Sequence, residues 1–283
     1  MKIQPYKPRP GSHLVMALPD IHFPRHDRHA LACVLGVIRL MRPTGLIQLG
    51  DAMDCESASS YPKRHLDEGK AERFYESQIL PMRGLLAYGE LYCDWWKILE
   101  GNHEFRVEAK LASLGDFGAD IADLVSPRKL LAQGRAKPFT YVPYVQKPSA
   151  PLPHVKIADD LVAVHGWSYC KHVAAKHLEI ARNSSILFGH VHRRQSHTVR
   201  QPIDNKILEA FTPGCLAQLQ PLYMAHTPTD AVHGFELIWV TNDGKRWTHY
   251  SVVIKDGVCV LPDGRKVDGR DYMKTLEKVE GGM

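Results

Sequence analysis

Five short clusters of Asp, Asn and His residues could bind divalent cations. They are Asp20-Ile21-His22, Gly50-Asp51-Ala52-Met53-Asp54, Gly101-Asn102-His103-Glu104, His165-Gly166 and Gly189-His190-Val191-His192. Carboxylate and amide oxygens combined with imidazole nitrogens suit Mn²⁺, Fe or Zn²⁺ better than Mg²⁺ or Ca²⁺. Taken singly, each cluster also fits a turn or a hydrogen-bonded core histidine. Taken together and in this order, they predict a metal centre.

Each cluster follows a short apolar segment that has the composition of a β-strand. These segments are 13–18, 46–49, 98–99, 161–164 and 186–188. Strands that repeatedly end in polar residues bring those residues to one edge of a sheet, where α/β proteins bind their ligands. The pattern therefore predicts an α/β fold with all five clusters at one sheet edge.

Helical segments separate these strands. Apolar residues spaced i, i+3, i+4 and i+7 from Leu31 to Met41 predict a helix, with Asp27 as its N-cap and Pro43 beyond its end. A helical insertion is predicted at about 57–92, and a second helical stretch at about 104–135. The segment 138–153 is rich in proline and predicts a loop or an edge segment.

The last third of the chain changes to strands, at 206–211, 235–240, 247–254 and 258–260. Residues 1–265 are expected to form a single domain. Residues 266–283 contain few apolar side chains and predict a flexible tail.

Composition indicates an ordinary globular protein. The chain has 283 residues, of which 44% are hydrophobic and 24% charged, and its net charge of +5 suits an anionic substrate without requiring one. The N-terminus lacks the apolar core of a signal peptide, and no apolar run is long enough to span a membrane. The six cysteines are scattered, as expected of reduced thiols. We therefore expect a cytoplasmic protein, in a bacterium or a phage-infected host, with no membrane partner. The oligomeric state stays open.

The clusters resemble those of the calcineurin-like metallophosphoesterase superfamily. The pattern of that family is D-x-H, G-D-x-x-D, G-N-H-[DE], then H, then G-H-x-H, and it is met at every position between Asp20 and His192. The resemblance implies a sandwich of two mixed β-sheets flanked by helices. It also implies a metal-dependent phosphoric ester hydrolase.

The resemblance assigns a role to each matching residue. Asp20, His22 and His192 would bind one metal ion, and Asn102, His165 and His190 the other, with Asp51 bridging the two. Mn²⁺ is the expected metal, with Fe, Zn²⁺ or Ni²⁺ as alternatives. A hydroxide bridging two ions about 3.5–4 Å apart would attack phosphorus in line.

The resemblance makes His103 the acid that protonates the leaving oxygen and Asp54 the carboxylate that orients it. A structural role for His103 remains the alternative. Glu104 is expected to cap the following helix rather than to contact substrate. In the protein Ser/Thr phosphatase branch, Arg-Gly follows the second motif. Here Cys55-Glu56 follows it, so the chain looks more like phage and bacterial stand-alone members.

Several cationic residues lie close in sequence to the metal-binding positions and could contact neighbouring phosphates. We take as candidate substrate-binding residues Arg25, His26, Arg106, Arg193 and Arg194. An ordinary solvated surface explains such residues equally well.

Three functions compete. The first is a phosphodiesterase or nuclease acting on nucleic acid, such as DNA, or on a nucleotide diester, and it is favoured. The second is a phosphomonoesterase for a small substrate. The third, a scaffold on a disabled fold, should show lost metal ligands, and none is lost.

Overall fold

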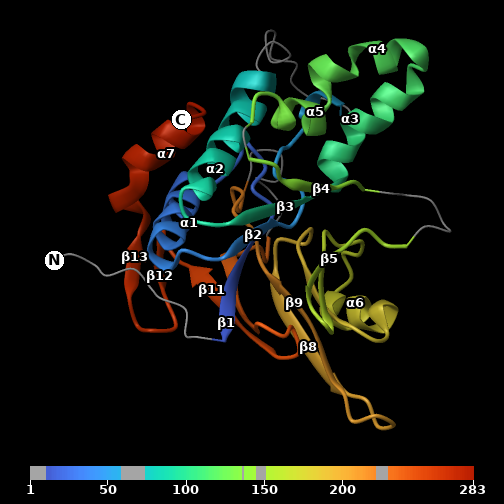
Figure 1. Ribbon diagram of the computed structural model, residues 1–283, viewed down its shortest axis with the longest axis vertical. Coiled ribbons are helices and arrows are strands. Elements are labelled where there is room, and N and C mark those ends of the chain that lie inside the picture. Colours follow the sequence, from blue (N-terminus) through green and yellow to red (C-terminus); the bar gives the residue numbers. More distant parts are fainter. Residues whose placement is uncertain (1–10, 59–73, 136, 145–150, 221–228) are drawn as a thin grey trace.

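Two mixed β-sheets pack face to face in the computed structural model (Figure 1). The structure describes residues 11–58, 74–135, 137–144, 151–220 and 229–283. The first sheet has the strand order β11-β10-β1-β2-β3-β4. Its strands are β11 (Trp247–Ile254), β10 (His233–Thr241), β1 (Ser12–Leu18), β2 (Gly45–Gln48), β3 (Trp95–Leu99) and β4 (Thr140–Val142).

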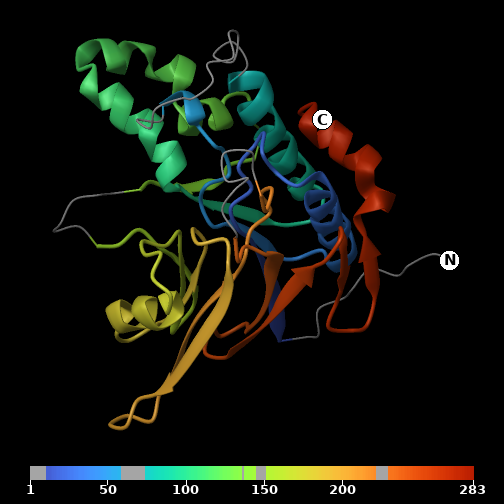
Figure 2. The same cartoon turned by 180° about the vertical axis from the view of Figure 1, so that it is seen from behind.

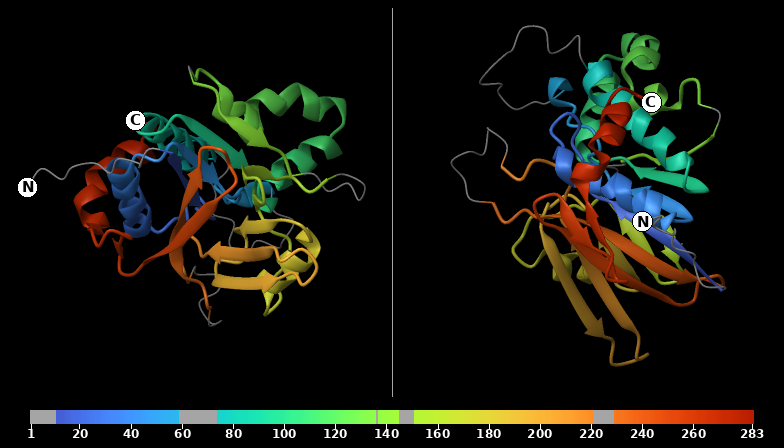
Figure 3. Two further views of the ribbon diagram at one scale, coloured as in Figure 1. Left: turned by 60° about the horizontal axis from the view of Figure 1, so that its bottom comes forward. Right: turned by 90° about the vertical axis from the view of Figure 1, so that its left-hand side faces the viewer.

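The second sheet has the order β5-β6-β7-β9-β8, and a separate two-stranded ribbon pairs β12 with β13. The strands are β5 (Val155–Ala158), β6 (Leu161–Val164), β7 (Ser185–Phe188), β9 (Ile207–Pro213), β8 (Arg194–Arg200), β12 (Val258–Val260) and β13 (Lys266–Asp268). Figure 3 shows both sheets from two further directions. The expected fold class, two mixed sheets flanked by helices, is confirmed.

The alternation of side chains along the strands divides the core into two layers. Val15, Ile47 and Phe211 belong to one buried cluster, which lies between the sheets. Leu14 and Met16 belong to another, in which the first sheet meets the helices on its outer face. Successive side chains on a strand point to opposite faces, so a strand buried on both faces reads as a continuous apolar run.

Helices cover the outer faces of both sheets (Figures 1 and 2). On the first sheet lie α1 (Arg28–Met41), η3 (Tyr75–Ile79), α2 (Leu80–Glu90), η5 (Gly269–Tyr272) and α7 (Met273–Glu280). On the second sheet lies α6 (Val173–Ala181), and a projecting helical segment comprises α3 (Asn102–Ser113), α4 (Asp116–Val125) and α5 (Pro127–Ala132). The expected N-cap of α1 is confirmed, because the Asp27 carboxylate accepts a hydrogen bond from Ala30 N at 2.8 Å.

The two predicted helical stretches are helical where the structure describes them. The first contains η1 (Glu56–Ala58), η3 and α2, while 59–73 lie outside the described residues. The second contains α3, α4 and α5. The proline-rich segment 138–153 contributes the edge strand β4, and 145–150 lie outside the described residues.

The prediction of a flexible tail at 266–283 is wrong. This segment forms β13, η5 and α7, and the side chains of Leu276 and Val279 are fully buried against the helical layer. Gly84 in α2 allows the close approach, because an added Cβ atom there would overlap the backbone of Val279. Two apolar residues one helical turn apart are a weak signal in sequence, yet they are enough to dock a short amphipathic helix.

All six cysteines are free thiols, five of them buried and Cys170 exposed. Among the described residues, no helix has the length and apolar composition that crossing a membrane requires.

Candidate functional site

All seven predicted metal-binding residues lie at one edge of the paired sheets. Strands β1, β2 and β3 are parallel, as are β6 and β7, so their carboxyl ends point the same way. Asp20, Asp51 and His190 follow three of these strands by two or three residues. The sheets meet at this edge, and the loops from both bring their side chains together there.

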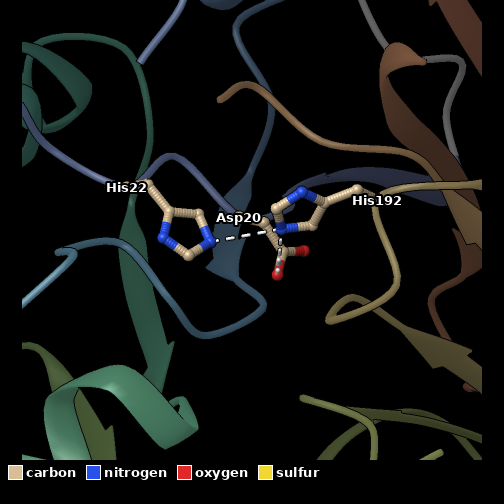
Figure 4. Close-up of side chains that lie close together, drawn as sticks. All are labelled: Asp20, His22 and His192. Atoms are coloured by element: carbon tan, nitrogen blue, oxygen red, sulfur yellow. Dashed lines mark hydrogen bonds and ion pairs between the residues drawn. The ribbon is translucent and has the colours of Figure 1, made fainter. Parts of the chain in front are cut away.

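The first group of ligands contains Asp20, His22 and His192 (Figure 4). The Nε2 atoms of the two histidines are 3.2 Å apart, and His192 Nε2 lies 3.6 Å from Asp20 Oδ1. Asp20 is fully buried, and both of its carboxylate oxygens accept the backbone N–H of His190 at 2.9 Å. A buried carboxylate facing two imidazoles is a set of donors suited to a cation.

The second group contains Asp51, His165 and His190, with Asn102 beside them. His165 Nε2 lies 3.0 Å from Asn102 Oδ1, 3.1 Å from His190 Nδ1 and 3.3 Å from Asp51 Oδ2. Bonds of about 2.0–2.2 Å to a common metal place adjacent donors about 3.0–3.5 Å apart. The separations around His165 therefore fit the edges of a coordination polyhedron.

Asp51 lies between the two groups. Its Oδ2 atom is 3.3 Å from His165 Nε2 in one group and 3.8 Å from His22 Nε2 in the other. Its Oδ1 atom accepts the backbone N–H of His103, at the start of α3, at 2.9 Å. A carboxylate held in this way can face two cations at once, as the sequence resemblance implies for Asp51.

Hydrogen bonds on the outer side fix the tautomers of two of the histidines. His165 Nδ1 donates to the Leu49 carbonyl at 2.8 Å, so in the neutral ring Nε2 carries the lone pair toward the site. His22 Nδ1 lies 3.2 Å from Asp54 Oδ1, and its Nε2 faces the first group. Carboxylate and carbonyl partners of this kind orient metal-binding imidazoles in proteins.

The backbone is strained where these side chains converge. Four of the predicted ligands have positive φ angles: His22 (55°), Asp51 (50°), His190 (73°) and His192 (58°). Such conformations cost free energy in residues other than glycine, and they cluster at functional sites. Two motif glycines permit the close approach, because a Cβ atom at Gly101 or Gly189 would overlap a site carboxylate.

The electrostatics of the site also suit bound cations. The pKa of Asp51 lies well below its usual range, because the charges of His165 and His103 outweigh the opposing effect of burial. Burial lowers the pKa of His190 to about 4, so its ring is neutral at pH 7 and can donate a lone pair. The nearby carboxylates outweigh burial at His165 and raise its pKa to about 9. A cation would therefore displace a proton from His165 on binding.

His103 lies beside both groups, and its ring reaches the site. The Nδ1 atom is 2.8 Å from the Asp54 carbonyl oxygen and 3.2 Å from Asp54 Oδ1, while Nε2 lies 3.9 Å from Asp51 Oδ2. The pKa of His103 is raised, because the charge of Asp51 and the hydrogen bond with Asp54 outweigh burial. This geometry matches the contact expected between His103 and Asp54. The role of His103 as an acid remains a prediction.

Glu104 caps α3, as expected, and it also joins two motif loops. Its Oε2 atom accepts the backbone N–H groups of Gly101 at 3.0 Å and Asp51 at 3.1 Å, and Oε1 accepts that of Met53 at 2.8 Å. Burial and the charge of Asp51 raise the pKa of Glu104 to about 7. The carboxylate therefore sets the position of Asp51 relative to α3.

The predicted substrate-binding residues have different surroundings. His26 is buried and pairs with Glu280 of α7 at 2.9 Å, so its ring is already engaged, and its contact with substrate stays a prediction. Arg25 stays beside the site, where it pairs with Asp54 at 3.0 Å and with Glu56 at 2.7 Å.

Of the other three candidates, one lies beside the site and two have other surroundings. Arg106 Nη1 lies 3.1 Å from His103 Nδ1, so Arg106 borders the centre. Arg193 instead donates to the carbonyl oxygens of Tyr169 and Cys170, at 3.1 and 2.9 Å. Arg194 is exposed at the start of β8.

Tyr169 is a residue at the site that the sequence did not indicate. Its hydroxyl lies 3.4 Å from His190 Nδ1, and its ring centroid is 4.1 Å from that of His190, yet the residue is 66% exposed. A tyrosine four residues after His165 looks in sequence like any loop residue. The turn at Gly166, where φ is 115°, brings it back over the metal-binding histidines.

Comparisons with known proteins give two sequence relatives and several structural ones. No family model matches the chain. The chain is 25% identical over 268 residues to the Gene 54 protein of Mycobacterium phage L5, which covers 90% of this chain and 97% of that protein. It is 24% identical over 235 residues to the Gene 54 protein of Mycobacterium phage D29, with coverage of 80% and 88%.

Among solved structures, a Vps29 single mutant from Entamoeba histolytica matches with a TM-score of 0.40 and 13% identity, covering 90% of this chain and 98% of that chain. Yfce, a phosphoesterase from E. coli, matches with a TM-score of 0.34 and 16% identity, covering 86% and 100%. The ordered motifs and the paired mixed sheets agree with the resemblance to calcineurin-like metallophosphoesterases, and both sequence relatives come from mycobacteriophages.

Proposed function

We propose that this chain is a metal-dependent phosphoesterase that uses two divalent ions, Mn²⁺ foremost, to hydrolyse phosphodiesters of nucleic acids or nucleotides. The observation that carries the proposal is the position of Asp51 between two groups of buried donors, with His103 beside it. Asp20, His22 and His192 would hold one ion, and Asn102, His165 and His190 the other. Bound at such a site, the ions would stabilise charge on the phosphoryl oxygens and supply an activated water.

The side chains of the protein would orient the acid His103, and His103 would supply a proton. Asp54 holds the His103 ring with Nε2 toward the site, and the raised pKa of His103 favours the protonated form of the ring. A protonated Nε2 can donate to the leaving oxygen as its bond to phosphorus breaks. Glu104 keeps the loop of Asp51 in register with α3, so the acid and the shared carboxylate keep a constant separation.

The charge balance around the site favours a diester. A dianionic monoester needs more positive charge around its phosphate than a monoanionic diester does. Two of the candidate cations are already neutralised, Arg25 by Asp54 and Glu56 and Arg193 partly by Asp230. Arg106 remains at the border of the centre.

The decisive experiment uses metal-stripped protein reloaded with Mn²⁺. Turnover of bis-p-nitrophenyl phosphate is compared with turnover of p-nitrophenyl phosphate, alongside single- and double-stranded DNA. Preferred cleavage of the diester together with DNA degradation supports the proposal. A preference for the monoester with intact DNA indicates a phosphomonoesterase, and two bound ions with no turnover indicate a scaffold.

The assignment of the ligands has its own test. His190→Ala removes the Nδ1 atom that lies 3.1 Å from His165 Nε2. We expect the variant to bind one ion with much lower affinity and to lose most of its activity. Elemental analysis that still finds two ions at full occupancy would refute the assignment. His154→Ala is the control, because His154 is exposed and bonds only locally to the Leu152 carbonyl oxygen.

A further inference from the structure

Two segments of the chain, residues 1–42 and residues 171–206, each carry a formal net charge of +5, and the second lies around α6 and β8. Residues 171–206 contain seven of the 36 Lys and Arg residues and two of the 31 Asp and Glu residues, so the rest of the chain has 29 of each. The segment comprises the approach to α6, α6 itself, β7 and β8, and it ends in the β8–β9 hairpin. A local excess of cations attracts polyanions, and two of the seven cations, Lys176 and Arg182, line one groove.

The groove belongs largely to this basic segment. It has a volume of about 770 Å³ and lies between α6 and the strands β8 and β9. Lys176 on α6, Arg182 at the C-cap of α6 and His197 on β8 supply polar groups to its walls, and all three are exposed. The apolar side chains of Leu178 and Val199 also line it. Among the described lining residues Glu179 is the one carboxylate, and it pairs with Lys176 at 3.0 Å, so a phosphate would have to displace it from that lysine.

One end of the groove lies beside the loop that carries Tyr169 to the metal-binding residues. Cys170 and His172 line that end, and Tyr169, which contacts His190, precedes them directly. Arg182 and Gln201 mark the other end of α6 and β8. The nine residues of α6 span about 13 Å at 1.5 Å per residue. An extended polymer that leaves the centre could follow the groove over this length.

The connection between groove and centre is held by hydrogen bonds. Arg193 donates to the carbonyls of Tyr169 and Cys170, and Gln195 both donates to the Lys171 carbonyl at 3.0 Å and accepts from Ala174 N at 2.8 Å. These contacts join the loop before α6 to the start of β8. The groove and the exposed ring of Tyr169 are therefore formed in advance of binding, which lowers the entropy lost on association.

Resting on the proposed function, we propose that this α6–β8 groove binds a single strand of nucleic acid whose scissile phosphate lies at the metal centre. Lys176 and Arg182 would contact backbone phosphates, the apolar lining would contact sugars and bases, and Tyr169 would stack on a base at the entrance. Cationic grooves combined with exposed aromatic rings bind single strands with little sequence preference. A duplex lacks the unstacked bases that the tyrosine and the apolar lining accept.

The test measures binding and hydrolysis separately. Binding of a fluorescent 12-nucleotide single strand is followed by anisotropy with EDTA present, at several salt concentrations. The variant Lys176→Gln/Arg182→Gln should lower the magnitude of the slope of log K against log salt by about 1.4, since each contact with a single strand contributes about 0.7. If the two proteins bind the strand equally at 1 M salt, this difference in slope makes the variant bind about 25-fold more weakly at 0.1 M salt.

The control is Lys274→Gln/Lys278→Gln, which removes two exposed cations from α7, on the opposite side of the molecule from α6 (Figures 1 and 2). This control should keep the wild-type slope and affinity. The groove variant should also keep wild-type turnover of bis-p-nitrophenyl phosphate, because that substrate is too small to reach Arg182. Equal weakening in both variants, or duplex binding as tight as single-strand binding, would overturn the inference.

The two proposals fail in different ways. If the wild-type protein hydrolyses no phosphate ester, the proposed function fails, while the anisotropy measurement still decides whether the groove binds a strand. If the small diester is cleaved but the groove variant binds and cuts oligonucleotides like wild type, only the groove assignment fails. Displacement of the strand by poly-glutamate at equal charge would show a general polyanion site and would also overturn it.

Discussion

Replacement of Glu104 should disturb both stability and activity, because this one side chain holds two motif loops together. Its carboxylate accepts backbone N–H groups from Gly101, Asp51 and Met53, all of which are buried. At pH 8, above its raised pKa of about 7, the carboxyl is ionised. Hydrogen bonds to a charged acceptor each contribute about 1.5–3 kcal/mol, and a buried donor left unpaired costs about 1–3 kcal/mol.

Two substitutions separate these contributions. In Glu104→Gln the amide oxygen can replace Oε2 and keep the donors from Gly101 and Asp51, but the amide nitrogen then faces Met53 N. One lost bond predicts a destabilisation of about 1–3 kcal/mol. Glu104→Ala leaves all three donors without the carboxylate, and we expect a loss of about 3–5 kcal/mol after some water enters.

The assay is urea unfolding at pH 8 with metals chelated, followed by turnover of bis-p-nitrophenyl phosphate in Mn²⁺. Stability should fall in the order wild type, Gln, Ala. Catalytic efficiency should fall in the same order, because the neutral amide of Gln holds Asp51 N more weakly than the carboxylate does and Ala removes that contact. Glu277→Gln, an exposed carboxylate on α7, is the control. If both Glu104 variants unfold within about 0.5 kcal/mol of wild type, the account of Glu104 as a joint between the loops is incorrect.

Three further predictions concern other parts of the molecule. His103→Asn should keep both metals yet lower turnover, most strongly for esters with poor leaving groups, and equal turnover on such esters would exclude the acid role. His249 contacts two glutamates, whose effect outweighs burial and raises the pKa of its ring to about 9. The protonated ring should therefore add about 2–3 kcal/mol to the free energy of unfolding below pH 6.5, and this contribution should be lost as pH rises through 9. Unfolding curves of wild type and His249→Gln should therefore converge above pH 9, and a pH-independent difference would contradict this. Leu276→Ala should destabilise the protein by about 2–4 kcal/mol in thermal unfolding, whereas a flexible tail would give no change.

The sequence by itself determined the chemistry of the site and the elements that present it. Asp, Asn and His residues recur directly after apolar segments, and the hydrogen-bonding rules of parallel strands place such strand ends at one edge. For that reason the grouping of the candidate ligands, the five strands that precede them and the helix from Asp27 to Met41 could be predicted without coordinates, as could the four later strands from their apolar pattern. These features depend on contacts between neighbours in sequence and on the period of the pattern.

The tertiary structure decided what depends on contacts between distant segments. The C-terminal helix was missed because two buried residues, Leu276 and Val279, become significant only when α2 offers a glycine to receive them. His26 and Arg193 could not be placed, because a charge near a motif in sequence can point toward Glu280 or toward a loop carbonyl instead. Tyr169 reaches the centre only through the turn at Gly166. A side chain's partner is set by the packing of whole elements, which no local pattern records.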